Sequence, residues 1–311
     1  MNWYRGFESF VKEDWPLAKL TTYRVGGPAR WFAQPHDAES LWQLLTRAAQ
    51  EGIEFKLLGH GTNLLVSDAG VNALVVKLPK TGFGWLHQSG TRLNVGGGHS
   101  LPGLVNWSVN HGLRGLEVLQ GVPGTIGAAL RMNAGGKYGE ICSAVKRVYG
   151  FERDGRPFDF DVSECGFVYR NSSLAGRIIT GCQLELKEGS AEEGKAIMKQ
   201  ILSEKCATQP VDARSAGCVF KNPKLPNTPP AGKLIDDLGL KGSNSGGASV
   251  STLHANFLIC QGDAKAADLV QLIRSIRERV LDARGLLLEL EVETWGFDAE
   301  ELMPAKECAA A

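Results

Sequence analysis

Gly121-Val122-Pro123-Gly124-Thr125-Ile126-Gly127 is a glycine-rich stretch in the first half of the chain. Three glycines within one short run let a backbone come close to a flat or phosphorylated ligand, because glycine has no side chain to keep the two apart. Val122 and Ile126 are apolar and suited to flank an aromatic ring, and a second small-residue run, Asn133-Ala134-Gly135-Gly136, follows soon after. The stretch predicts a ligand cradle, with a simple packing site between two backbones as the alternative.

A second glycine loop lies earlier, at Leu57-Leu58-Gly59-His60-Gly61-Thr62-Asn63-Leu64, directly after an apolar run. Glycines let backbone N–H groups turn toward one anion, and Thr62 and Asn63 add donors. An ordinary tight turn between strands explains the same residues equally well. A GxGxxG pattern with an acidic partner about twenty residues later is not convincingly present, so a Rossmann dinucleotide unit is not favoured.

The bulk composition argues against several classes of protein. The chain has 311 residues and a formal net charge of zero, which gives no reason to expect nucleic acid or an anionic membrane as a partner. No apolar run has the length of about 18 residues that a membrane span needs, and the first residues lack the apolar run of a signal peptide. Seven scattered cysteines without CxxC spacing favour reduced thiols, so we expect a cytoplasmic protein with no metal site and no disulfide framework.

Hydrophobic periodicity and turn residues predict an α+β chain. The expected elements are a helix over 37–50 with Asp37 as N-cap, strands over 53–58, 74–78 and 91–95, a helix capped by Ser100, strands over 145–151 and 177–186, a helix after Ser190, a helix over 263–284, and a strand over 286–295. These segments group into domains over 1–80, 81–188 and 189–297, with a tail over 298–311.

Residues with reactive side chains gather in three places. Gly217-Cys218-Val219-Phe220-Lys221-Asn222-Pro223 holds a thiol, Tyr169-Arg170 precedes it with a cation, and Glu291 follows it on the last predicted strand. A thiol proton source, a cation and a carboxylate suit protonation of a carbon beside a stabilised enolate. Each residue also has a plainer explanation: a surface ion pair, a small buried filler, and, since Glu289, Glu291 and Glu293 alternate, a solvated strand face.

Seven ordered motifs resemble the UDP-N-acetylenolpyruvoylglucosamine reductase family. The resemblance runs from Thr21-Thr22-Tyr23-Arg24-Val25-Gly26-Gly27 to Glu291-Val292-Glu293-Thr294-Trp295-Gly296, through 58–63, 121–127, 133–139, 169–172, 217–223, 231–235 and 254–257. It implies a two-part FAD-binding region of the vanillyl-alcohol oxidase and p-cresol methylhydroxylase type, over 1–80 and 81–188, and an α+β substrate-binding domain over 189–297. Because Tyr169-Arg170-Asn171-Ser172-Ser173-Leu174 leads almost at once into the next strand, the chain resembles the shorter family form, which lacks a tyrosine-bearing loop.

The resemblance also implies an activity. A flavoprotein oxidoreductase of this family uses non-covalent FAD and NADPH to reduce UDP-N-acetylglucosamine enolpyruvate to UDP-N-acetylmuramate. That reaction serves peptidoglycan synthesis, and through it cell wall biogenesis, cell shape and cell division. We expect a cytoplasmic monomer. Two alternatives stay open: an FAD-dependent oxidase of the same fold acting on an alcohol or sugar, and a nucleotide-binding scaffold without turnover.

Residue roles follow from the resemblance position by position. Arg170, Cys218 and Glu291 are the catalytic set, although Cys218 stands where many family members carry serine. A thiol with an ordinary pKa of about 8.5 is mostly protonated at neutral pH and can act as a general acid. Glu291 either helps Arg170 to stabilise the enolate or is a second proton source. The residues assigned to FAD are Gly59, His60, Gly61, Thr62, Asn63, Leu64, Pro123, Gly124, Thr125, Asn133, Gly135 and Ile178, and those assigned to the substrate are Tyr169, Lys221, Asn222 and Lys233.

Overall fold

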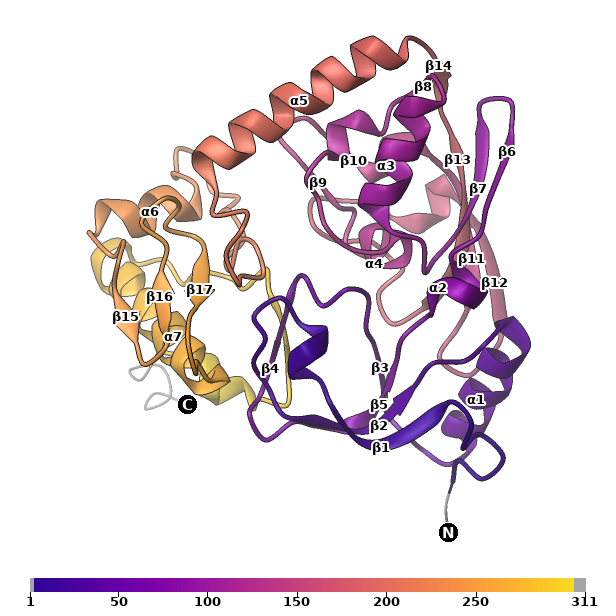
Figure 1. The fold of residues 1–311 in the computed structure, drawn as a ribbon. Helices are drawn as coiled ribbons and strands as arrows, with labels where there is room; N and C mark the ends of the chain where they lie inside the picture. The colour runs from indigo at the N-terminus through magenta and orange to yellow at the C-terminus, as the bar shows by residue number, and fades with distance from the viewer. Residues whose placement is uncertain (1–2, 305–311) are drawn as a thin grey trace. The chain divides into compact units, whose positions relative to one another are not determined.

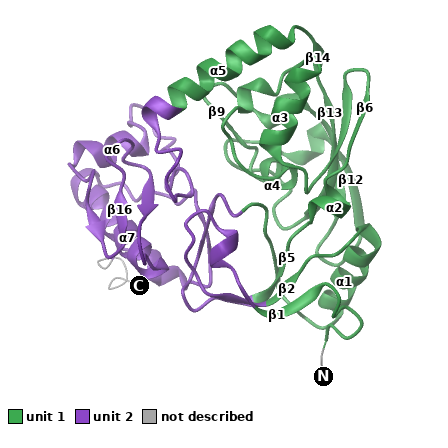
Figure 2. Ribbon diagram, in the orientation of Figure 1, with its two compact units in different colours: residues 1–14, 31–60, 73–205 green, residues 15–30, 61–72, 206–311 purple. Residues whose placement is uncertain are grey.

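The computed structural model describes residues 3–304, which form an α+β chain (Figure 1). They group into two compact units of interleaved sequence, shown in separate colours in Figure 2. Unit 1 contains the residues up to 14 together with 31–60 and 73–205, and unit 2 contains 15–30, 61–72 and the residues from 206 onward. The three-domain division expected from the sequence stays a prediction.

A four-stranded sheet of order β1-β2-β5-β3 begins the chain. Its strands are β1 (Val11–Pro16), β2 (Pro28–Ala33), β5 (Val71–Val76) and β3 (Phe55–Leu57), and the first three each pass from one unit into the other. Helix α1 (Ala38–Gln50) starts where predicted, because the Asp37 carboxylate accepts a hydrogen bond from the Ser40 backbone N–H at 2.8 Å. Its leucines at 41, 44 and 45 are fully buried, as the helical spacing requires.

A five-stranded antiparallel sheet of order β12-β11-β13-β7-β6 is the centre of unit 1. Its strands are β6 (Leu86–Ser89), β7 (Arg92–Gly96), β11 (Val145–Phe151), β12 (Pro157–Asp161) and β13 (Ile178–Glu185). Helix α3 (Leu101–Asn110) begins at Ser100, whose hydroxyl accepts from the Gly103 N–H, and the short helix α4 (Ile126–Arg131) packs against β7 and β13. The predicted strands over 91–95, 145–151 and 177–186 are therefore confirmed.

The other elements of unit 1 are short, apart from the helix that leads into unit 2. They are α2 (Lys80–Phe83), β8 (Leu113–Arg114), β9 (Gly135–Gly136), β10 (Gly139–Glu140), β14 (Lys187–Glu188) and α5 (Ala191–Thr208). The 3-10 turns of the chain are Ala18–Leu20, Glu117–Leu119, Ile141–Ala144, Val162–Cys165 and Ala299–Leu302.

Unit 2 packs two helices with short strands around one core. Its elements are β4 (Leu64–Val66), α6 (Ala231–Asp237), β15 (Asn244–Ser245), β16 (Ala248–Val250), β17 (Leu258–Cys260), α7 (Ala266–Arg284) and β18 (Glu293–Trp295). The Asp68 carboxylate accepts from the backbone N–H groups of Ala266 and Ala267 at 2.9 and 3.0 Å, which satisfies the first turn of α7. Gly285, with φ +62°, ends α7 as the sequence predicts.

The strand expected over 286–295 forms only in its last part, as β18. Upstream of it, the backbone makes an irregular pairing with the 219–221 segment: the Lys221 N–H donates to Glu289 O at 2.8 Å, and Phe220 lies opposite Leu290 in an isolated bridge. Part of the expected tail is packed, since Arg277 donates to Leu302 O at 2.6 Å, and residues 305–311 lie outside the described part. No helix within residues 3–304 combines the length and the hydropathy needed to cross a bilayer.

Candidate active site

Cys218 and Glu291 lie on two adjoining backbone segments of unit 2. The Glu291 N–H donates to Val219 O at 2.8 Å, so the predicted carboxylate residue pairs with the residue next to the predicted thiol. The Val292 N–H reaches the same oxygen at 3.3 Å. Two of the three residues assigned to catalysis, far apart in sequence, are thus neighbours in the fold.

Asn256 holds the segment that follows Cys218. Its side-chain oxygen accepts from the Phe220 N–H at 2.9 Å, and its amide nitrogen donates to Phe220 O at 2.8 Å. Its backbone oxygen accepts from the Val219 N–H at 2.9 Å, while the next residue, Phe257, lies opposite Cys218 in an antiparallel bridge. Asn256 is only 3% exposed. The sequence marked the 254–257 motif without giving it a role.

Asn63 holds the segment that carries Glu291. Its side-chain amide donates to Glu291 O at 3.0 Å, and its backbone oxygen accepts from the Glu293 N–H at 3.0 Å. The pairing continues as the parallel ladder between β4 and β18. The residue expected at the cofactor phosphate therefore contacts the backbone of the predicted catalytic glutamate.

The two glutamates on either side of Glu291 have partners of their own. Glu289 is exposed and forms an ion pair with Lys221, and the Glu293 carboxylate accepts from the Trp295 indole N–H at 2.9 Å. Glu291 is half-buried. The expectation that three alternating glutamates share one strand face is wrong for this region, because the backbone from 286 to 292 is not a regular strand.

Cys218 differs in burial from most of the other cysteines. Cys165, Cys182 and Cys260 are buried, Cys142 and Cys218 are half-buried, and Cys206 is exposed. Burial raises the pKa of Cys165 to about 11, and burial followed by the charge of Asp268 raises the pKa of Cys260 to about 12. Thiols with such raised pKa values stay protonated and unreactive. The half-buried Cys218 thus differs from these core cysteines in its access to a ligand.

Arg170 belongs to unit 1, on a tight turn closed by reciprocal backbone hydrogen bonds between Val168 and Asn171 at 3.0 and 3.1 Å. Arg170 has φ +55°, and its guanidinium lies 5.3 Å from the centre of the Tyr169 ring. The buried Asn133 donates to Val168 O at 3.1 Å and so ties this turn to the interior of unit 1. Arg170 and Tyr169 thus contact each other on a turn that backbone hydrogen bonds close.

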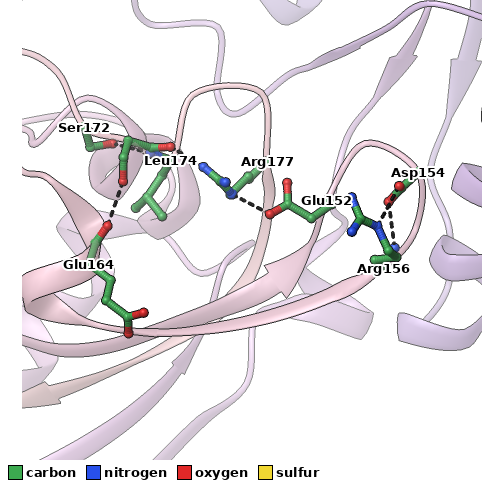
Figure 3. Close-up of polar contacts among 8 residues, drawn as sticks. Glu152, Asp154, Arg156, Glu164, Ser172, Leu174 and Arg177 are labelled. Carbon is green, nitrogen blue, oxygen red and sulfur yellow. Dashed lines mark hydrogen bonds and ion pairs between the residues drawn. The ribbon is translucent and has the colours of Figure 1, made fainter.

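The residues after the turn are anchored by a chain of polar contacts (Figure 3). The Ser172 hydroxyl accepts from the Leu174 N–H at 3.3 Å, and the Arg177 guanidinium pairs with Glu152 at 2.8 Å. Ser172 also donates to Arg131 O at 2.6 Å. The turn leads from there directly into β13, which begins at Ile178, so the backbone on both sides of Arg170 is tied to the fold.

A second cation, Lys205, lies near Arg170 and was not predicted from the sequence. The Lys205 ammonium, at the end of α5, donates to Gln120 O at 2.6 Å, directly before Gly121. Burial lowers the pKa of Lys205, and the charge of Arg170 lowers it further. Lysine in the last turn of a helix is ordinarily solvent-exposed, so nothing in the sequence distinguished this residue.

The glycines at 127 and 135 allow backbones to approach, whereas those at 59 and 121 lie against the side chains of Thr125 and Lys205. A Cβ on Gly59 would lie 3.1 Å from the Thr125 hydroxyl, and one on Gly127 would lie 3.2 Å from Gly97 O. A Cβ on Gly135 would lie 2.2 Å from Gly139 O. Close backbone packing, the alternative to a ligand cradle, therefore occurs here. Thr125 caps α4, Leu64 and Ile178 are core residues, Gly124 is buried with φ +127°, and Pro123 is exposed.

The predicted phosphate loop has one feature that suits an anion. Burial and then the charge of Lys77 lower the pKa of His60, while burial lowers the pKa of Lys77. No ion pair of Lys77 is present within residues 3–304. An exposed imidazole and a half-buried ammonium whose charges interact fit a diphosphate, which would stabilise their charged forms. Lys77 directly follows the apolar strand β5, and a single lysine there gives no sequence signal.

The residues assigned to the substrate pair within the protein. Lys221 forms its ion pair with Glu289, and Lys233 forms one with Asp237, one helical turn later. The Asn222 side chain accepts from the Ala231 N–H at 3.0 Å, which satisfies the first turn of α6. Their role toward a nucleotide sugar stays a prediction. No cluster of three metal-ligating side chains occurs in the described chain.

Two parts of the sequence match the models of known protein families. Residues 29–161 match the FAD binding domain model, and residues 209–295 match the UDP-N-acetylenolpyruvoylglucosamine reductase C-terminal domain model. The chain is 39% identical over 308 residues to the UDP-N-acetylenolpyruvoylglucosamine reductase of Desulfosudis oleivorans, covering 93% of this chain and 96% of that protein. It is 41% identical over 296 residues to the protein of the same name from Anaeromyxobacter, covering 94% and 91%.

A solved structure agrees with these relatives. The UDP-N-acetylenolpyruvylglucosamine reductase of Thermus caldophilus superposes with a TM-score of 0.80 at 39% identity, over 92% of this chain and all of that one. The predicted fold class, an FAD-binding region joined to an α+β domain, is confirmed, and so is FAD as the cofactor of that region. The chain therefore belongs to the UDP-N-acetylenolpyruvoylglucosamine reductase family of flavin-dependent oxidoreductases.

Proposed function

We propose that this protein uses NADPH to reduce UDP-N-acetylglucosamine enolpyruvate to UDP-N-acetylmuramate, a step of peptidoglycan precursor synthesis. The observation that carries the proposal is the backbone pairing that makes Glu291 the neighbour of the Cys218 segment, in a chain of this family. Bound FAD would supply the hydride chemistry, from NADPH to the vinyl methylene carbon of the substrate. The protein's own residues bind, orient and protonate.

Cys218 gives the proton that completes the reduction. Once the methylene carbon has received hydride, negative charge develops on the adjacent carbon and its carboxylate. Arg170 offers a guanidinium to that carboxylate, and Glu291 assists in holding the enolate. The Cys218 Sγ–H bond then breaks, its proton forms the new C–H bond, and the thiolate recovers a proton from water. Two electrons thus come from NADPH and one proton from the thiol.

The cofactor region supplies a place for the FAD diphosphate. His60 and Lys77 are the basic groups near the predicted phosphate loop. Burial lowers the pKa of both and so disfavours their charged forms, and the charge of Lys77 lowers the pKa of His60 further. A diphosphate beside them would offset that cost. Thr125 and the glycines next to it would line the same region.

The UDP diphosphate needs cations of its own. Lys221 and Lys233 suit this task because their present partners, Glu289 and Asp237, form ion pairs at partly exposed sites. Such pairs contribute only about 0–1 kcal/mol, so a diphosphate can replace the carboxylates at small cost.

The six described cysteines form no disulfide, which supports a cytoplasmic location. We also expect a monomer, and light scattering would test this by measuring the molar mass in solution.

The experiment that tests the function separates the two half-reactions. The purified protein is reduced without oxygen by one equivalent of NADPH, UDP-N-acetylglucosamine enolpyruvate is added, and the flavin absorbance is followed. Return of the oxidised spectrum, with UDP-N-acetylmuramate found by mass spectrometry, is the expected result.

Three other outcomes would contradict the proposal. A flavin that stays reduced until air is admitted would favour an oxidase. A flavin that NADPH does not reduce would remove NADPH as the donor. A protein that binds no flavin would favour a nucleotide-binding scaffold.

A further inference from the structure

We propose that three asparagines, Asn63, Asn133 and Asn256, are positioning residues, one for each residue that the proposed function uses in catalysis. The inference rests on that function for the roles of Glu291, Arg170 and Cys218. Two of these asparagines were expected to contact FAD, and the third had no expected role. In the structure each amide instead hydrogen-bonds to the backbone of a catalytic segment.

Asn256 fixes the segment that carries Cys218. Both polar atoms of its side chain bond to the backbone of Phe220, which is itself 1% exposed, and its own carbonyl bonds to Val219 N–H. A backbone held at two consecutive residues has little freedom to move the residue before them. Loss of the amide would leave the buried N–H and C=O groups of Phe220 without these partners. Unpaired buried polar groups cost free energy, and the segment would lower that cost by moving toward water.

Asn63 completes the support of Glu291. The N–H of Glu291 bonds to Val219 O, and the C=O of Glu291 bonds to the Asn63 amide, so both backbone polar groups of the glutamate are held. One bond ties it to the Cys218 segment and the other ties it to the start of β4. Backbone hydrogen bonds therefore tie the segment that carries the thiol to the segment that carries the carboxylate.

Asn133 supports the turn that carries Arg170. Its two amide hydrogens are both used, one toward Glu140 at 2.8 Å and one toward Val168 O at 3.1 Å, and its oxygen accepts from the Cys142 N–H at 3.3 Å. No donor of this amide is left for a phosphate. Its φ of +45° is one that asparagine tolerates better than most residues, which adds a backbone reason for its presence.

The test compares three variants with a matched control. Asn63→Ala and Asn256→Ala remove the amides, and Asn133→Gly removes the third without straining a positive φ. Asn106→Ala is the control, because its amide also donates to a backbone carbonyl, that of Pro102 at 2.9 Å, but at an exposed position within α3. For each protein we would measure the FAD dissociation constant, flavin reduction by NADPH, and single-turnover reduction of the enolpyruvyl sugar.

Positioning predicts a selective loss. Substrate reduction should fall by about 10- to 100-fold, the cost of a misplacement of about 1 Å, while the other two quantities change by less than about threefold. The control should match the unmodified protein. A loss of FAD affinity with an unchanged substrate step would instead make the asparagines cofactor ligands, and unchanged values throughout would remove any role in catalysis.

A double-variant comparison separates positioning from general stability. In a Cys218→Ala background, Asn256→Ala should cost the substrate step little more, because a group cannot misplace a thiol that is gone. An equal additional loss in that background would refute positioning. If Asn256→Ala does not fold, Asn63→Ala in a Glu291→Ala background gives the same test at a half-buried site.

A readout without turnover distinguishes failure of this inference from failure of the proposed function. Iodoacetamide labelling of Cys218, followed by peptide mass spectrometry, should be faster in Asn256→Ala than in the unmodified protein and in Asn106→Ala. Unmodified protein that does not reduce the sugar would overturn the proposed function, and the catalytic meaning of the asparagines with it. Turnover by the unmodified protein together with unchanged labelling and rates in the variants would overturn the asparagine proposal alone.

Discussion

Replacing Gly61 by alanine tests why the predicted phosphate loop contains glycine. Gly61 has φ +64°, and a Cβ built on it would lie 2.1 Å from Leu20 O and 2.9 Å from Thr21 Cα. Gly52 has the same φ of +64° but no atom within 4 Å of the added Cβ. Gly52→Ala therefore carries the backbone strain alone, whereas Gly61→Ala carries both strain and overlap.

The expected magnitudes follow from these two terms. An alanine in the left-handed region costs about 1–2 kcal/mol at either position. Overpacking adds about 1–3 kcal/mol at Gly61, because the atoms in the way belong to the backbone and cannot rotate aside. The Gly61 carbonyl also accepts from the Thr22 N–H and hydroxyl at 3.1 and 3.2 Å, so the loop cannot shift without disturbing those bonds. We expect a loss of about 2–5 kcal/mol for Gly61→Ala against 1–2 kcal/mol for Gly52→Ala.

Urea denaturation of the two apoproteins measures the difference, with FAD titration as a second assay. Gly61→Ala should also weaken FAD binding, since Thr22 and the loop would move together, while Gly52→Ala should leave it unchanged. Equal losses of stability in the two variants would show that positive φ alone explains the glycine. The steric argument would then be refuted.

Three further predictions concern the site. Cys218→Ala should leave flavin reduction by NADPH nearly intact but cut substrate reduction by roughly 10²–10⁴-fold, the usual share of general acid catalysis, whereas Cys218→Ser should keep substantial activity. Stopped-flow absorbance measures both half-reactions, and equal turnover in the alanine variant would remove the thiol from the mechanism. Burial, followed by nearby lysines, lowers the pKa of His60 and of His254, so the unfolded chain binds more protons and the apoprotein should lose stability as pH falls below about 6.5. Urea midpoints across pH check this, and a His60→Gln, His254→Gln protein with the same slope would contradict it. Lys77→Met should weaken FAD binding by about tenfold or more, the loss of one charge-assisted hydrogen bond, and an unchanged dissociation constant would exclude Lys77 from the diphosphate site.

Helix α1 and the last strand show where reading the sequence succeeds and where it fails. Asp37 and four apolar residues at helical spacing are local signals, and α1 forms where they predict it. Leu286 to Trp295 also alternates, yet only β18 is regular, because its neighbour is the irregular 219–221 segment. Alternation predicts which side chains can share a face, but a strand also needs a partner with matching hydrogen bonds.

The candidate site divides in the same way. Ordered motifs, which carry residue identity, assign Arg170, Cys218 and Glu291 to catalysis, and that assignment stays a prediction. Lys77 and Lys205 were missed because a single lysine carries no pattern, and only burial makes each of them unusual. The motifs assign the lysines at 221 and 233 to the substrate, which stays a prediction, while their ion pairs with Glu289 and Asp237 depend on how chain segments meet.

The family, the local elements and the identity of the reactive side chains can be read from the sequence, because they follow from short-range patterns and motif order. Only the tertiary structure decided that Asn63, Asn133 and Asn256 hold backbone carbonyls and N–H groups of the catalytic segments. An asparagine can bind a phosphate, cap a turn or clamp a distant strand with the same amide. Which of these it does depends on the polar groups that folding brings within about 3 Å, and no local pattern records that.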